Sequence, residues 1–187
     1  MARMMNGITD IIEYCRQRRY EFYPTITDAR PSYASVLMKH IQERAERDLP
    51  RAQIEGNLEE GNLAHLVEMA GLLSIKDGII EEVIYSKPDV SMLYRENGFI
   101  VCRAGATSCM FPMSPFEQKG GDIVDYHSHP DGGGELSDGD VDNMMQRNRI
   151  TRMLKSINPA IGDYHFTIYL PHKKDAVWFV PKKIENQ

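Results

Sequence analysis

The sequence predicts an α+β fold, an α/β sandwich in which helices flank one mixed sheet, with a helical extension at the N-terminus. Two observations predict it. Helix-forming stretches come first, and from Gly71 onward the chain changes to short runs of β-branched and aromatic residues between turn signals. A long polar helix pattern then begins near Ser137, and two more β-like runs follow it. Helices before, within and between strands are typical of one sheet with covered faces.

The N-terminal third of the chain is predicted to be mostly helical. Ile8–Arg19 and Ser32–Asp48 have helix-forming compositions, and prolines separate them. A third helix is predicted over Leu58–Ala70, which is rich in Leu, Ala and Glu.

The central and C-terminal parts contain the strand signals. The Asp77-Gly78 pair is typical of a tight hairpin turn between two strands. The runs predicted as strands are Leu72–Ile75, Ile79–Tyr85, Phe99–Arg103, Thr107–Phe111, Asp122–His127, His165–Leu170 and Ala176–Val180. Between them a helix is predicted from Ser137 to Ile157. Its basic residues are expected on a solvated face: Arg147, Arg149, Arg152 and Lys155.

The composition is that of an ordinary globular protein. Of 187 residues, 42% are hydrophobic and 26% are charged, which suits one domain with its own core. A formal net charge of −5 provides no general attraction to nucleic acid or to an anionic membrane. The sequence has no apolar run long enough to cross a membrane and no apolar core of a secretory signal at its start. We expect a cytoplasmic protein without nucleic-acid or membrane partners.

The cysteines agree with that location. Cys15, Cys102 and Cys109 are an odd number without a C-x-x-C spacing, which is typical of free thiols in a reducing compartment. A bridge between Cys102 and Cys109 across a hairpin is the alternative.

Two histidines lie at the end of a predicted strand. Residues two apart on a strand point to one face, so His127 and His129 can direct their imidazoles at one point. After a glycine-rich turn, Asp140 falls in the first turn of the next predicted helix and can supply a third ligand. Two histidines and a carboxylate leave one position of a tetrahedral zinc ion open, as in catalytic sites. Zinc would lower the pKa of a water there toward about 7.

Part of this pattern also has a purely structural interpretation. Ser137 and Asp140 match the capping pattern S-x-x-[DE] at a helix start, which needs no function. Capping does not account for the two histidines on the preceding strand. Both interpretations can be correct at once, because a capped helix start holds a metal ligand in a fixed position.

The spacing His127-x-His129, seven residues, Ser137, two residues, Asp140 resembles the H-x-H-x7-S-x2-D motif of the JAMM (MPN-plus, JAB domain) metalloproteases at every fixed position. The resemblance covers roughly Leu58 to Val180. It implies a JAMM/MPN-like catalytic domain over residues 58–187 and leaves residues 1–57 as an N-terminal helical extension.

The same family carries a catalytic glutamate upstream, where a helix leads into a strand, in an E-x-x-G-hydrophobic-hydrophobic context. Glu68 has this context, since Gly71 follows it by three residues and two leucines come next. Family members often have a further glycine soon afterwards, where this chain has Ser74-Ile75-Lys76. That departure affects a turn and no residue of the expected chemistry.

The resemblance implies a role for each of these residues. His127, His129 and Asp140 would bind one zinc ion. Glu68 would take a proton from the attacking water and pass it to the leaving amine. Ser137 would donate a hydrogen bond to the oxyanion of the tetrahedral intermediate. Asp125, on the same strand face as His127, is a further candidate for orienting an imidazole.

JAMM enzymes hydrolyse isopeptide or peptide bonds after the C-terminal glycine of ubiquitin or ubiquitin-like modifiers. The expected partner is therefore such a modifier or its conjugates, and the compact chain resembles prokaryotic members, including deconjugating peptidases of bacterial defence operons. The alternatives are a peptidase or amidase for a sulfur-carrier protein or small conjugates, and a non-enzymatic MPN interaction module. The N-terminal helices are candidates for substrate docking, self-association or occlusion of the site.

Overall fold

The computed structural model describes the chain in segments. The described residues are 4–5, 23–27, 34–48, 51–54, 57–60, 66–86, 93–102, 120–130 and 133–182. Four expectations lie outside these residues: the helix Ile8–Arg19, the strand Thr107–Phe111, and the cysteines Cys15 and Cys109.

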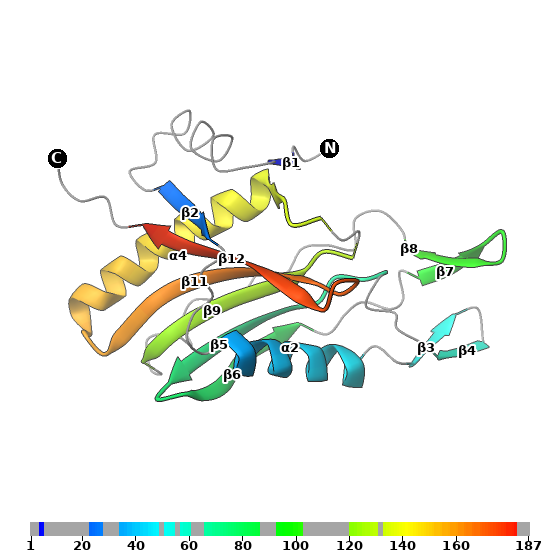
Figure 1. Ribbon diagram of the computed structural model, residues 1–187, viewed down its shortest axis with the longest axis horizontal. Coiled ribbons are helices and arrows are strands. Elements are labelled where there is room, and N and C mark those ends of the chain that lie inside the picture. The colour runs from blue at the N-terminus through cyan, green and yellow to red at the C-terminus, as the bar shows by residue number, and fades with distance from the viewer. Residues whose placement is uncertain are drawn as a thin grey trace.

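A six-stranded sheet forms the centre of the molecule, in the order β2-β12-β11-β9-β5-β6 (Figure 1). Its strands are β2 (Tyr23–Thr27), β5 (Ala70–Lys76), β6 (Ile79–Ser86), β9 (Gly121–Ser128), β11 (Ile161–Leu170) and β12 (Asp175–Lys182). Strands β9 and β11 are parallel, and the other neighbours are antiparallel. The predicted α+β class with a mixed sheet is confirmed.

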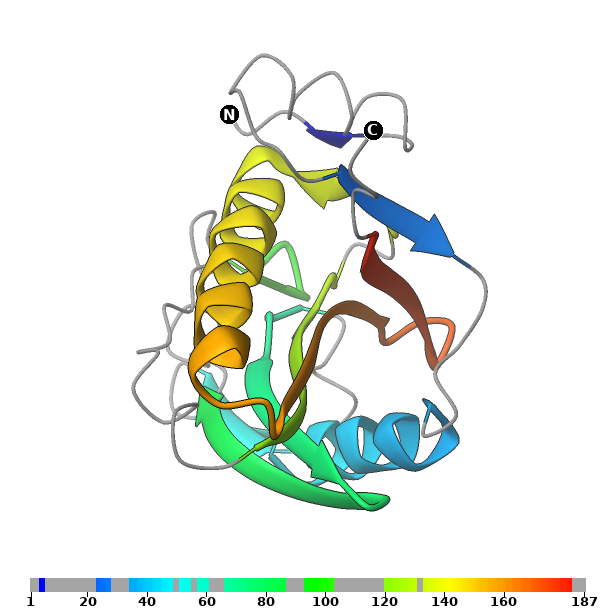
Figure 2. The same ribbon diagram turned by 90° about the vertical axis from the view of Figure 1, so that its left-hand side faces the viewer.

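Two helices cover the opposite faces of this sheet. Figure 2 shows the sheet passing between α2 (Ala34–Asp48) and α4 (Asp138–Ile157). The expected helices Ser32–Asp48 and Ser137–Ile157 are thus confirmed to within two residues.

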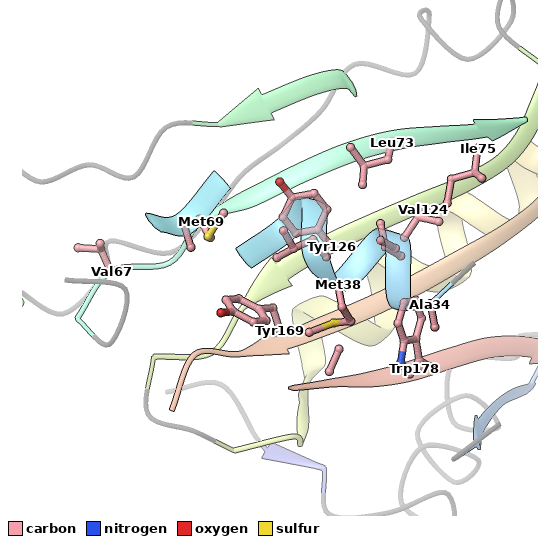
Figure 3. Close-up of a cluster of buried hydrophobic side chains, with 14 of the residues drawn as sticks. Ala34, Met38, Val67, Met69, Leu73, Ile75, Val124, Tyr126, Tyr169 and Trp178 are labelled. Carbon is pink, nitrogen blue, oxygen red and sulfur yellow. The ribbon is translucent and has the colours of Figure 1, made fainter. Parts of the chain in front are cut away.

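The apolar core has one part on each side of the sheet. On the α2 side, Leu37 and Ile41 belong to a buried cluster with Leu73 of β5 and Val124 of β9. Figure 3 shows this cluster, with Ala34 and Met38 of the helix facing Val124, Tyr126 and Trp178 of the strands. The cluster on the α4 side contains Leu72, Ile123, Leu136, Val141, Met144, Met145, Leu154, Ile161, Tyr164, Phe166, Ile168, Leu170 and Phe179. Successive residues of β9 therefore point alternately to the two helices.

Within the described segments, three two-stranded pairings accompany the main sheet. They are β1 (Met4–Met5) with β10 (Leu136–Ser137), β3 (Arg51–Ile54) with β4 (Asn57–Glu60), and β7 (Leu93–Glu96) with β8 (Phe99–Cys102). Asn97 and Gly98 form the β7–β8 turn at φ 52° and 84°, and Asp77 and Gly78 form the expected β5–β6 turn at 53° and 75°.

The predicted helix over Leu58–Ala70 is wrong at both ends, and residues 61–65 between them lie outside the described residues. Residues 57–60 form strand β4, residues 66–69 are not helical, and β5 begins at Ala70. Helix propensity is a weak preference that tertiary contacts override. Here residues 57–60 make their backbone hydrogen bonds with β3. At the other end of the predicted helix, hydrogen bonds between Met69 and Ser128 hold the chain against strand β9.

The N-terminal extension, residues 1–57, is not helical throughout, because it also supplies β2 and β3. Strand β2 pairs with β12 at the edge of the main sheet. Pro24 has no N–H group to donate to a neighbouring strand, which an edge strand tolerates. Helix α2 shares its buried cluster with β5 and β9. Residues on both sides of the predicted boundary at position 57 thus belong to one core.

Gly71 is required by a close approach of the Tyr126 ring. A Cβ built at Gly71 would overlap that ring, which is fully buried. We expect Gly71→Ala to lower the free energy of unfolding by about 1–3 kcal/mol, because added volume in a packed core forces strained rearrangement. Urea unfolding measures the effect. In the control, Gly139→Ala, the nearest side-chain atom to the new Cβ lies 3.8 Å away, and no loss is expected. Equal unfolding midpoints for Gly71→Ala and wild type would contradict the packing argument.

Candidate metal centre

The two motif histidines point to one place. Strand β9 ends at Ser128, and the His129 amide still donates to the Tyr169 carbonyl of β11 at 2.9 Å, which keeps the chain extended past the strand end. The alternation of side chains therefore holds across His127 and His129. Their Nε2 atoms lie 2.9 Å apart, with ring centroids separated by 4.8 Å.

Helix α4 brings the carboxylate of Asp140 to the same place. Asp140 Oδ1 lies 3.4 Å from His127 Nε2, and Oδ2 lies 3.8 Å from His129 Nε2. All three side chains are only partly accessible, with 11–19% of their surface exposed. The structure thus brings together the three residues that the sequence proposed as ligands, from a strand end and a helix start.

These separations suit a single metal ion. Tetrahedral coordination with bonds of about 2.0–2.1 Å places neighbouring ligand atoms about 3.3 Å apart. The three separations here are 2.9, 3.4 and 3.8 Å, and one ligand atom from each residue lies within 4.8 Å of the others. His127, His129 and Asp140 therefore lie close enough to bind a metal ion.

Both imidazoles are prepared to act as ligands. His129 Nδ1 lies 2.9 Å from the Gly133 carbonyl, which can only accept, so Nδ1 carries the proton and Nε2 keeps its lone pair. Burial lowers the pKa of His127 to about 4, against the opposing effect of the nearby Asp140 carboxylate. At neutral pH His127 is therefore neutral, which is the form that binds metals.

The helix cap holds Asp140 in place. Asp140 Oδ2 accepts from the Ser137 backbone amide and from Ser137 Oγ, both at 2.7 Å, and the Asp140 amide donates back to Ser137 Oγ at 3.3 Å. The capping box expected from the sequence is present. It engages Oδ2 and leaves Oδ1 directed at His127, so capping and ligand placement are achieved by the same contacts.

We expect Ser137→Ala to lower the free energy of unfolding by about 1 kcal/mol, the usual cost of losing a helix cap. It should also weaken metal binding, because Asp140 loses the hydroxyl that fixes its carboxylate. Denaturant unfolding and a chelator competition assay measure the two effects. Ser137→Thr, which keeps the hydroxyl, is the control. Wild-type metal affinity in Ser137→Ala would show that the serine only caps the helix. The oxyanion role of Ser137 stays a prediction.

Glu68 lies two residues before strand β5, without the helix expected for it. The Ser128 amide donates to the Met69 carbonyl, and the Met69 amide donates to Ser128 Oγ, both at 2.9 Å. Ala70 pairs with His127 in the β5–β9 ladder. If this register continued by two residues, Glu68 would fall level with His129. Glu68 itself is half-buried, and the bonds of its neighbour Met69 to Ser128 fix the backbone beside it.

A buried polar cluster lies next to the ligands. Asp125, Arg147 and Tyr164 are 3%, 6% and 2% exposed. The expectation that Arg147 lies on a solvated helix face is wrong, although Arg149 and Arg152 are exposed as expected. The signal that could have identified Arg147 is its spacing, because residues three, four and seven after Asp140 share its helix face.

No helix in the described part of the chain has the length and apolar character needed to cross a membrane. Comparisons of the chain with protein-family models, with curated proteins and with solved structures gave no match. The likeness to JAMM enzymes therefore rests on the motif residues and their spacing in the sequence.

Proposed function

We propose that this protein is a zinc-dependent peptidase of the JAMM type, which hydrolyses the isopeptide or peptide bond after the C-terminal glycine of a ubiquitin-like modifier. The observation that carries the proposal is the convergence of His127, His129 and Asp140 on one point, at separations that suit a tetrahedral ion. The family motif has its ligands at these three positions.

The donor set is compatible with zinc, and the resemblance to the JAMM motif favours zinc among the metals that such a set binds. Two imidazole nitrogens and one carboxylate oxygen are typical of catalytic zinc sites with an open position. When bound, the ion would supply Lewis acidity that activates water and polarises the scissile carbonyl.

The chain's own residues supply the remaining chemistry. Glu68, two residues before the Ala70–His127 pair, is the proposed general base that accepts a proton from the attacking water and then donates it to the leaving amine. Asp140 would help to hold the ion, and its Oδ1 is the oxygen that the helix cap does not engage. The substrate class follows from the family resemblance, and the geometry of the centre is compatible with hydrolysis of any amide that reaches it.

Purification in the presence of zinc, followed by metal analysis and a cleavage assay, tests the proposal. The substrate is a ubiquitin-like modifier with a peptide fused after its C-terminal glycine, and a lysine-linked conjugate distinguishes deconjugation from precursor processing. We expect about one zinc ion per chain and cleavage directly after the glycine. Cleavage of small amides without cleavage of either modifier substrate would favour the amidase alternative. Bound zinc without any hydrolysis would favour a non-enzymatic interaction module.

A further inference from the structure

The proposed metal ligands come from two separate elements, which must be aligned for the ligand atoms to meet. His127 and His129 belong to the β9 strand end, and Asp140 belongs to helix α4. The separation of their ligand atoms therefore depends on how α4 sits against β9. Most of the contact between these elements is apolar, and apolar contacts alone are not directional.

A polar cluster interrupts this apolar interface. Tyr164 of β11 donates its hydroxyl to Asp125 Oδ2 at 3.1 Å, and Arg147 Nε lies 4.0 Å from the same oxygen. Arg147 Nε also donates to Asn143 Oδ1 at 3.2 Å. A hydrogen bond thus connects β11 to β9, and the Arg147–Asp125 ion pair, with a side-chain hydrogen bond of Asn143 to Asp125, connects α4 to β9 in the interior.

The cluster occupies the layer next to the ligands. Asp125 precedes His127 by two residues and shares its strand face, while Asn143 and Arg147 follow Asp140 by three and seven residues on its helix face. Any shift of the helix along or around its axis that moves Asp140 would also disturb the contacts of Arg147.

Stability alone gives little reason for a charged pair in this place. Replacing a buried ion pair with neutral or apolar residues of similar volume is often neutral or stabilising. A metal centre, in contrast, loses much of its affinity or activity when its ligands are misplaced by about 1 Å.

We propose that Asp125, Arg147 and Tyr164 are positioning residues, which fix helix α4 against strand β9 and so set the distance from the Asp140 carboxylate to the two imidazoles. The inference rests on the metal centre of the proposed function and adds the residues that hold its two halves in register.

The test uses the double variant Asp125→Asn/Arg147→Met in the full chain. It removes one negative and one positive charge, so the net charge near the metal is unchanged, and no buried charge is left without a partner. We expect it to unfold cooperatively at nearly the wild-type temperature but to bind Zn²⁺ about 10- to 100-fold more weakly in a chelator competition assay, the usual cost of losing contacts that support metal ligands. The visible spectrum of the Co²⁺-loaded chain, which reports coordination geometry, should change as well.

A matched control comes from the other face of the sheet. Arg44 of α2 donates to Glu82 of β6 at 2.8 Å, and this pair connects a helix to the sheet without touching the metal centre. Arg44→Met/Glu82→Gln should leave both the zinc affinity and the cobalt spectrum at wild-type values.

The outcomes separate this inference from the proposed function. A folded Asp125→Asn/Arg147→Met variant with wild-type zinc affinity and cobalt spectrum would overturn the positioning role. If that variant does not fold, Tyr164→Phe removes only one hydroxyl from the cluster, and wild-type zinc affinity in it would overturn the role equally. Wild-type protein that binds zinc but cleaves no modifier substrate would contradict the proposed peptidase and leave the positioning role standing.

Discussion

Glu68→Gln is expected to retain about one zinc ion per chain and to lose cleavage by a factor on the order of 10²–10⁴, the usual contribution of a general acid–base group. The amide is nearly isosteric with the carboxylate but cannot accept a proton from water. The zinc ligands are untouched, so the metal content should stay at the wild-type level. Elemental analysis and initial rates on a modifier fusion measure the two quantities.

The control for this experiment is a glutamate outside the centre. Glu81 lies on β6, two strands away from β9, and Glu81→Gln should keep both zinc and the wild-type rate. Wild-type cleavage by Glu68→Gln would remove Glu68 from the mechanism. Loss of zinc in Glu68→Gln would mean that this side chain supports the metal site itself.

His129→Ala is expected to reduce the zinc content from about one ion per chain to nearly none, and cleavage should fall with it. One of three protein ligands disappears, and His127 and Asp140 alone do not form a catalytic zinc site of the usual kind. The fold should survive, because the anchoring bond to Tyr169 uses the His129 backbone amide. Elemental analysis of the purified variant, with thermal unfolding as a check, measures the result.

His172→Ala is the matched control, since His172 is an exposed histidine in the β11–β12 turn. It should keep the wild-type zinc content. A full complement of zinc in His129→Ala would place the ion elsewhere and contradict the assigned ligand set.

The ligand set could be predicted from the sequence because its geometry is mostly local. His127 and His129 are brought together by strand alternation, and Asp140 by a helix cap three residues after Ser137. The approach of the α4 start to the end of β9, which sets Asp140 against the imidazoles, could be anticipated only through the family spacing. The structure now shows the three residues together.

The features that the sequence did not reveal depend on contacts between distant segments. Leu58, Glu59 and Glu60 favour a helix by composition but pair with β3 as a strand. Strand β2 lies among prolines and forms because β12 offers an edge. Arg147 resembles any surface arginine until Asp125 and Tyr164 are seen beside it. Strand β7, in contrast, could have been predicted, because the Asn97-Gly98 pair that follows it is a hairpin-turn signal in the sequence.

We propose that hydrolysis depends on a metal ion held by His127, His129 and Asp140. The most direct measurement is the rate of modifier-fusion cleavage by wild-type protein before metal removal, after stripping by a chelator, and after zinc is restored. We expect stripping to abolish cleavage and about one equivalent of zinc per chain to restore it. Full cleavage by metal-free protein would exclude a metal-dependent mechanism.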